Sequence, residues 1–315
     1  MLGDMAGPSI ILDCDPGHDD VVAIIAAAAH TDLLGVTTVA GNAPLDRTTH
    51  NACIVRDWLG LRAPVHAGAD RPLVGAPKYA AFVHGASGLD GAPLPEPSRG
   101  ADSPDAVGFI IDTARAHPGL TLVPTGPLTN IALALRAAPD LAQHVAAISL
   151  MGGGTYGNRT PAAEFNIWAD PEAAQIVFTS GVPITMAGLD LTHQFLLVPE
   201  RVDQVRALPG SLAKILGDLF GFFCTNYVER HRHMPGAALH DPLAVLAVTH
   251  PDLFTSARRH VTVETRGEHT IGQTVIDRRG MHDAEPPNVD VLESVDADAA
   301  WNIVLAAIAD FSANT

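Results

Sequence analysis

The segment with the strongest chemical character is a run of acidic residues near the N-terminus. Residues 13–20, Asp-Cys-Asp-Pro-Gly-His-Asp-Asp, place four carboxylates within eight positions. Carboxylates this close repel one another unless a cation or shared protons relieve the charge. The turn at Pro16-Gly17 would point Asp15 and Asp20 to a common centre, while Asp19 projects elsewhere. Such oxygens favour Ca²⁺ or Mg²⁺ over zinc; the alternative is a solvated loop with an Asp helix cap.

The elements around this segment alternate between short β-rich runs and longer helical patterns, which is typical of βα units and a largely parallel sheet. The predicted strands are Ile10–Asp13, Leu34–Val39, Val65–Ala67, Thr121–Pro124, Ala147–Met151 and Ile184–Ala187. The predicted helices are Asp20–Ala29, Asp46–Leu59, Pro104–Ala116, Leu128–Leu135, Pro171–Ser180, Leu212–Glu229, Pro242–Val248 and Ala297–Phe311. Two alternating runs, Val261–Val263 and Gln273–Ile276, predict a late hairpin at a sheet edge.

Polar residues and glycines follow most of the predicted strands. In an open α/β sheet, ligands bind outside the carboxyl ends of the strands, so these residues would gather at one edge. The stretch from Gly85 to Ser103, rich in Pro and Gly, is predicted to be a long mobile loop. No interdomain linker is visible. We therefore expect residues 1–315 to form a single α/β domain with an open, mostly parallel, Rossmann-like sheet flanked by helices.

Composition narrows the classes of partner. The chain has 315 residues, 47% hydrophobic and 17% charged, which indicates a globular protein. Its 19 Lys and Arg against 35 Asp and Glu give a net charge of −16, which argues against nucleic acid or anionic lipid as a partner. The three cysteines form no pairing motif, so we expect reduced thiols in the cytoplasm. No signal peptide or membrane span is predicted, because the longest uncharged apolar stretch is Val21–Ala29.

Residues 13–20 resemble the N-terminal signature of the nucleoside hydrolases of the inosine-uridine preferring type, which cleave the N-glycosidic bond of ribonucleosides. The resemblance continues in order along nearly the whole chain, through Val39–Asn42, His84–Gly85, Thr125–Asn130, Met151–Gly153, Asn158–Asn166 and His240–Pro242. It implies a ribonucleoside substrate, calcium as the cofactor, and a homodimer or homotetramer. From the residues alone, the Thr125 segment could equally be an ordinary turn before a helix.

The resemblance also implies roles for individual residues. Asp15, Asp20, Asp241 and the Thr125 carbonyl would hold Ca²⁺, with Asp19 as general base and His240 close to the leaving base. Asn42, Asn158, Glu164 and Asn166 would bind ribose hydroxyls, and the remaining substrate-binding positions would be His84, Met151, Phe165 and Tyr227. For the asparagines the alternative is a loop side chain that satisfies its own backbone, and for His84 a flexible loop.

Base recognition is the part that the pattern leaves open. Phe223, Tyr227 and His231 recur at i, i+4 and i+8 and would share one helix face, which usually means core packing. The family lines its nucleobase pocket with three positions of this spacing, although these lie one residue farther from His240 than expected. Purine versus pyrimidine preference stays open. At the position of His240, purine-restricted relatives tend to use tryptophan. A histidine there favours a broad or inosine/uridine-type substrate range.

The chemistry expected is hydrolysis through an oxocarbenium-like transition state, by a Ca²⁺-bound water that an Asp activates, with inversion at C1′. One alternative is a metal-dependent phosphohydrolase with Asp13 as nucleophile and Asp15 as acid/base. That chemistry generally needs a lysine, and only Lys78 and Lys214 exist, in no recognisable motif. Another alternative is a non-catalytic nucleoside-binding protein, which would have no use for Asp19.

Overall fold

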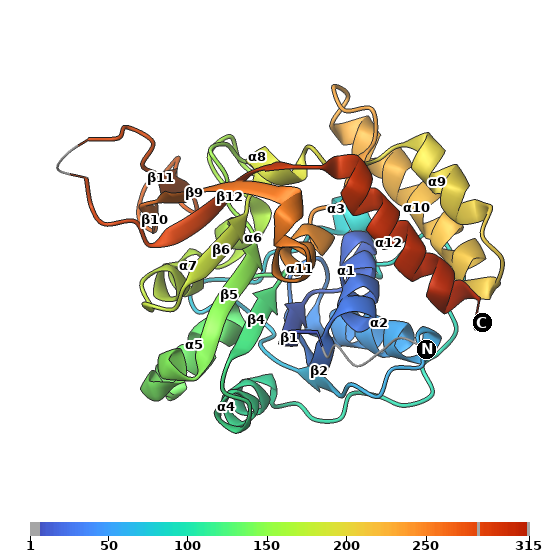
Figure 1. Ribbon diagram of the computed structural model, residues 1–315, viewed down its shortest axis with the longest axis horizontal. Helices are drawn as coiled ribbons and strands as arrows, with labels where there is room; N and C mark the ends of the chain where they lie inside the picture. Colours follow the sequence, from blue (N-terminus) through green and yellow to red (C-terminus); the bar gives the residue numbers. More distant parts are fainter. Residues whose placement is uncertain (1–6, 282–283, 314–315) are drawn as a thin grey trace.

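The structure is a computed structural model that describes residues 7–281 and 284–313. Its centre is an eight-stranded sheet of order β3-β2-β1-β4-β5-β6-β12-β9, in which only β9 runs antiparallel to its neighbour. The strands are β1 (Ser9–Cys14), β2 (Asp32–Thr38), β3 (Val65–Ala67), β4 (Leu120–Pro124), β5 (Val145–Met151), β6 (Ile184–Ala187), β9 (Phe254–Arg259) and β12 (Val289–Val295). The open, mostly parallel sheet expected from the sequence is confirmed (Figure 1).

Helices fill most of the connections between these strands. They are α1 (His18–His30), α2 (Leu45–Trp58), α3 (Ala81–His84), α4 (Ala106–Ala116), α5 (Thr129–Ala137), α6 (Phe165–Ala169), α7 (Pro171–Phe178), α8 (Leu189–Thr192), α9 (Pro199–Arg206), α10 (Ser211–Arg230), α11 (Pro242–Thr249) and α12 (Ala297–Ser312), with short 3₁₀ turns η1 (Pro139–Gln143) and η2 (Pro251–Leu253). Two small antiparallel sheets complete the fold, β7 (Leu196–Leu197) with β8 (Ala237–Ala238) and β10 (Val261–Val263) with β11 (Thr274–Ile276).

The two faces of the sheet carry separate hydrophobic cores. Along β1, Ile10, Leu12 and Cys14 point into a core shared with α1, α10, α11 and α12, whereas Ile11 points into a second core with α4, α5 and α7. This alternation follows from the two-residue repeat of a strand, and a strand covered on both faces reads as a continuous apolar run. The layers of helices on either side of the sheet are visible in Figure 1.

Every predicted strand and helix is present, with ends shifted by a few residues. The late hairpin is confirmed as β10 and β11, which form a two-stranded sheet of their own. The sequence prediction missed β9 and β12, and therefore the outer end of the sheet. The alternation in Val289-Asp290-Val291 is visible in the sequence, but its parallel pairing with β6, far earlier in the chain, is not.

The segment from 85 to 103 contains no helix or strand, as expected for a loop. It is nevertheless anchored, because the buried Arg56 of α2 donates hydrogen bonds to the carbonyls of Arg99 (2.6 Å) and Gly100 (3.1 Å) and forms an ion pair with Asp102. No helix among the described residues is long and apolar enough to cross a membrane.

Candidate active site

The carboxylates predicted from opposite ends of the chain meet at the carboxyl edge of the sheet. Asp19 and Asp20 lie in the first turn of α1, and Asp241 immediately precedes α11. Each of the three offers an oxygen within 4.8 Å of the others, and all are buried. The expectation that Asp19 projects away from the common centre is not met. Two consecutive residues of the first helical turn both face Asp241, because α11 packs against α1.

Asp15 lies near this trio, packed against two glycines. The backbone N–H of Asn42 donates to its Oδ2 at 2.6 Å, and its Oδ1 has no hydrogen-bond partner although it is buried. A Cβ atom on Gly41 or Gly126 would overlap the Asp15 carboxylate. Glycine at these two positions therefore makes room for a buried carboxylate.

Asp20 is tied to the opposite wall through Thr125. Its oxygens accept hydrogen bonds from the Gly17 N–H and from the Thr125 hydroxyl, both at 2.9 Å. The Thr125 carbonyl in turn accepts from the Asn166 amide at 2.8 Å. Thr125 thus connects the acidic cluster, through its hydroxyl, with the Asn166 side chain, through its carbonyl.

Four ionised carboxylates in this cluster would be electrostatically unfavourable without a cation. Burial raises the pKa of Asp15, Asp19, Asp20 and Asp241, and for Asp15, Asp19 and Asp241 the charges of neighbouring aspartates raise it further, to about 7 for Asp19. Among the described residues, no Lys or Arg pairs with any of the four. Asp15 and Asp19 each keep a buried oxygen without a partner. Hard oxygen donors in this state suit a divalent cation.

A cleft opens above the cluster, with about 600 Å³ of empty volume that is partly open to solvent. Its lining includes most of the predicted site residues, namely Asp19, Asn42, His84, Thr125, Met151, Asn158, Glu164, Phe165, Asn166, Tyr227, His240 and Asp241. Asp15 and Asp20 do not line the cleft. Of residues 13–20, only Asp19 faces the space that a substrate would fill.

One polar wall of the cleft is fixed by the start of α6. The Glu164 carboxylate accepts backbone hydrogen bonds from Gly153 (3.0 Å), Asn166 (2.8 Å) and Ile167 (3.1 Å) and so caps the helix. The Asn158 side-chain oxygen accepts from the Phe165 N–H at 2.9 Å. These backbone bonds hold the side chains in one arrangement before any ligand arrives.

His240 lies in a buried chain of hydrogen-bonding groups. Its Nδ1 is 2.8 Å from the Thr192 hydroxyl, and its Nε2 is 3.3 Å from the Tyr227 hydroxyl. Burial lowers its pKa far below 6.5, and the neighbouring His193 and His231 lower it further. The imidazole is therefore neutral near pH 7, with one N–H to donate and one lone pair to accept.

The helix face whose role the sequence did not decide lies at the cleft. Phe223, Tyr227 and His231 of α10 all contribute to its lining. Phe223 and Tyr227 are only 1% and 3% exposed, so they also belong to the core. Core packing and pocket lining are therefore compatible at these positions.

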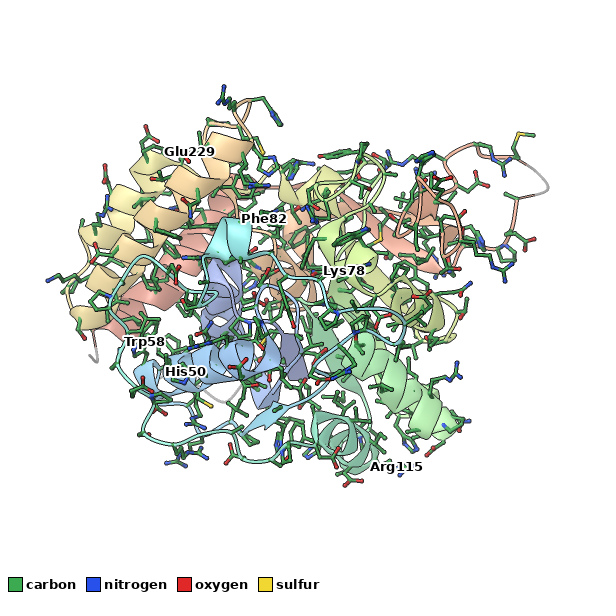
Figure 2. The ribbon with its side chains drawn as sticks, turned by 180° about the vertical axis from the view of Figure 1, so that it is seen from behind. His50, Trp58, Lys78, Phe82, Arg115 and Glu229 are labelled. Carbon is green, nitrogen blue, oxygen red and sulfur yellow. The ribbon has the colours of Figure 1, made fainter. Side chains whose placement is uncertain are left out.

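Four lining residues were not predicted: Ala80, Phe82, Val83 and Arg159. The guanidinium groups of Arg159 (5.1 Å) and Arg230 (4.2 Å) both lie over the Phe82 ring of α3, at the end of α10 that carries Glu229 (Figure 2). Arg159 also covers the Trp168 ring at 4.7 Å. Such cation–π contacts join distant segments, and no spacing in the sequence indicates them.

The phosphohydrolase alternative finds no support in this geometry. Asp13 is fully buried, and its Oδ1 accepts hydrogen bonds from Thr37 (2.6 Å) and Asn130 (2.7 Å). Asp13 does not line the cleft, and the Lys78 ammonium donates to the Trp168 carbonyl. A nucleophile must reach its substrate, which Asp13 cannot do here.

Known proteins resemble this chain over nearly its whole length. The model of the family "Inosine-uridine preferring nucleoside hydrolase" matches residues 10–302. The chain is 44% identical to the pyrimidine-specific ribonucleoside hydrolase RihA of Shewanella oneidensis, over 96% of each chain. It is 43% identical to RihA of Photobacterium profundum, over 96% of this chain and 99% of that one.

Among solved structures, a purine-preferring ribonucleoside hydrolase from Gardnerella vaginalis is similar, with a TM-score of 0.91 and 35% identity over 98% of this chain and all of that one. A plant nucleoside hydrolase gives a TM-score of 0.89 and 31% identity, over 96% of this chain and 99% of that one. The chain therefore belongs to the inosine-uridine preferring nucleoside hydrolase family and is an N-glycosyl hydrolase that acts on ribonucleosides.

Proposed function

We propose that this enzyme hydrolyses pyrimidine ribonucleosides, with Asp19 as general base beside a bound calcium ion. One observation carries the proposal, namely a cleft with acidic groups at its base, polar side chains on its walls and aromatic rings around it. The pyrimidine preference is supported by relatives such as RihA of Shewanella oneidensis, which is described as pyrimidine-specific. Neutral His240 in the lining fits a base that is bound by hydrogen bonds.

Asp15, Asp20, Asp241 and the Thr125 carbonyl would hold the cation. The buried oxygens without partners on Asp15 and Asp19, and the close approach of Asp20 to Asp241, support a cation with several oxygen ligands. When bound, calcium would supply charge that orients a water and two ribose hydroxyls and makes the water more acidic.

Asp19 would take the proton from the attacking water. Its carboxylate faces the cleft, and its Oδ1 has no partner that competes for the proton. The transition state of N-glycosidic cleavage carries positive charge on the sugar, which buried carboxylates stabilise. The other carboxylates that line the cleft, Glu164 and Asp241, have other roles in this proposal, so we infer direct displacement by water with inversion.

The substrate would lie across the cleft. Asn42, Asn158, Glu164 and Asn166 would bind the ribose hydroxyls, beside Met151 and Phe165. His84, Phe223, Tyr227 and His231 would surround the base. His240 and Tyr227, 3.3 Å apart, would hydrogen-bond the departing base, whose anion is a poor leaving group.

Other properties belong to the same proposal. We treat residues 1–315 as one domain, since a single sheet takes strands from Ser9 to Val295. We propose a homodimer or homotetramer by analogy with the family. The three cysteines are free, as a reducing compartment such as the cytoplasm requires.

The direct test is incubation with uridine, cytidine and inosine, followed by measurement of free base and ribose. Uridine and cytidine should be cleaved with higher kcat/KM than inosine. EDTA should abolish turnover and Ca²⁺ should restore it, because the acidic cluster needs a cation. A preference for inosine would contradict the pyrimidine assignment alone, and full activity in EDTA would contradict the metal assignment.

Calcium affinity should depend on pH. The pKa values of Asp15, Asp20 and Asp241 are raised by burial, so protons compete with the cation for these carboxylates more strongly as the pH falls. The dissociation constant, measured by calorimetry, should therefore decrease from pH 6 to pH 8, with release of protons. Carboxyls of ordinary pKa would give equal values at both pH values, which would contradict the prediction.

Asp19→Ala should lower kcat by about 10²–10⁴-fold, as loss of a general base does. Calcium binding should persist, because the other ligands remain. Steady-state kinetics and calorimetry measure the two effects. The control is Asp46→Ala, an acid-to-alanine change in the first turn of α2, outside the lining of the cleft. Turnover of Asp19→Ala near that of the control would remove Asp19 from this role.

His240→Ala should slow uridine by about 10²-fold but affect a p-nitrophenyl riboside much less. The nitrophenolate departs without a proton, so loss of a donor to the leaving group costs little. His250→Ala, at the other end of α11, is the matched control. Equal losses on the two substrates would count against the role of His240.

A further inference from the structure

We infer that Thr274 is a positioning residue, which holds the turn at Gly153-Gly154 and, through that turn, the Glu164 carboxylate. This inference rests on the proposed function, because it takes Glu164 to bind a ribose hydroxyl. Thr274 begins β11, the second strand of the late hairpin, and it does not line the cleft. Thr274 can therefore affect a substrate only through other residues.

The Thr274 hydroxyl binds both backbone groups of one residue. It donates to the carbonyl oxygen of Gly154 at 2.8 Å and accepts from the Gly154 N–H at 2.9 Å. Thr274 is only 3% exposed, so a side chain without a hydroxyl would leave two buried backbone groups without these partners. A threonine or a serine can form this pair of bonds, whereas valine, which has the same shape as threonine, cannot.

The turn that Thr274 holds consists of two glycines, whose backbone is the most flexible in proteins. Gly153 and Gly154 have φ angles of 74° and 149°, and a Cβ on Gly153 would lie 2.7 Å from the Thr274 Cγ2. The peptide group between the two glycines donates its N–H to Thr274, and its carbonyl accepts from the Leu189 N–H at 2.8 Å. Both ends of this peptide group are therefore held from outside the turn, and loss of the Thr274 contact would release one of them.

The preceding peptide group points at Glu164. The Gly153 N–H donates to Glu164 Oε2 at 3.0 Å, and the same oxygen accepts from the Ile167 N–H at 3.1 Å. Ile167 belongs to α6, the helix that Glu164 caps, so Gly153 supplies a contact from outside that helix. Glu164 is 2% exposed and lines the cleft. The direction of the Gly153 N–H therefore helps to set the position of the carboxylate that a substrate would meet.

The hairpin has anchors other than the Thr274 hydroxyl. Val261 and Val263 of β10 are buried in the second core, and a Cβ on Gly272 would lie 2.7 Å from the Trp168 Cα of α6. An isolated two-stranded hairpin is marginally stable, and these contacts stabilise it. We therefore expect loss of the hydroxyl to disturb the glycine turn more than the hairpin itself.

These contacts give Thr274 an influence on sugar recognition. An ionised carboxylate forms strong hydrogen bonds to hydroxyl groups, but only where the geometry is right. Burial raises the pKa of Glu164, whereas the N–H groups of Asn166 and Gly153 oppose this and favour the ionised form. A Gly153 N–H that turned away would leave the Glu164 carboxylate less fixed and less stabilised. A hairpin far along the chain would thereby take part in binding the ribose.

The first test is Thr274→Val, which removes the hydroxyl and keeps the shape of the side chain. It should lower kcat/KM for uridine by about 5- to 10-fold, as loss of one well-placed hydrogen bond does. Thr274→Ser should stay near wild type, because serine keeps the hydroxyl. Thr262→Val, at an exposed position of β10, is the matched control and should have no effect. Normal turnover in Thr274→Val, or an equal loss in Thr274→Ser, would overturn the inference.

A substrate profile tests whether the loss depends on Glu164. The values of kcat/KM for uridine and for its 2′-, 3′- and 5′-deoxy analogues are compared in wild type, Thr274→Val and Glu164→Gln. Glu164→Gln should lose least on the analogue that lacks the hydroxyl bound by Glu164, and Thr274→Val should lose least on the same analogue. A merely structural effect would lower all four values equally, and that result in Thr274→Val would overturn the inference.

Failure of the proposed function gives a different result. Glu164→Gln would then lose equally on every analogue, which would contradict the role of Glu164 in binding ribose and, with it, this inference. Where circular dichroism shows that Thr274→Val does not fold, Thr274→Ala, which also lacks the hydroxyl, takes its place in both comparisons. A crystal structure of the wild type in which the Thr274 hydroxyl contacts neither backbone group of Gly154 would overturn the inference without any variant.

Discussion

Repulsion among buried carboxylates is the constraint on which the rest of the site depends. Asp15, Asp19, Asp20 and Asp241 are all at most 4% exposed, and no cationic side chain among the described residues compensates them. The N-terminus of α1 and the N–H of Gly17 stabilise part of the charge. The remainder requires a cation or bound protons, so the cluster is stable only in combination with one of them.

The surrounding fold keeps these carboxylates close together through residues that each make hydrogen bonds to two parts of the site. Thr125 bonds Asp20 through its hydroxyl and Asn166 through its carbonyl. Glu164 caps α6 and thereby orients Asn166. A parallel sheet makes this possible, because β1 and β4 end at the same edge and α11 brings Asp241 across it.

Local pattern predicted most of this architecture, since buried parallel strands and capped helices leave clear signals. The proximity of Asp241 to the acidic residues 13–20 was expected only through the family resemblance, because no spacing in the sequence indicates it. The pairing of β12 with β6 and the contacts of Phe82 with Arg159 and Arg230 depend on tertiary packing.

The two sides of the cleft differ in electrostatic character, since one carries carboxylates and the other neutral imidazoles, and this difference would suit the proposed reaction. The acidic end attracts a cation and favours positive charge on the sugar. On the other side, burial lowers the pKa of the lining residues His84, His231 and His240, so these three imidazoles are neutral near pH 7. A charged acid beside the base would weaken the stabilisation of the oxocarbenium ion. In the proposed mechanism, neutral His240, which is hydrogen-bonded to Thr192 and Tyr227, would assist the leaving group without that cost.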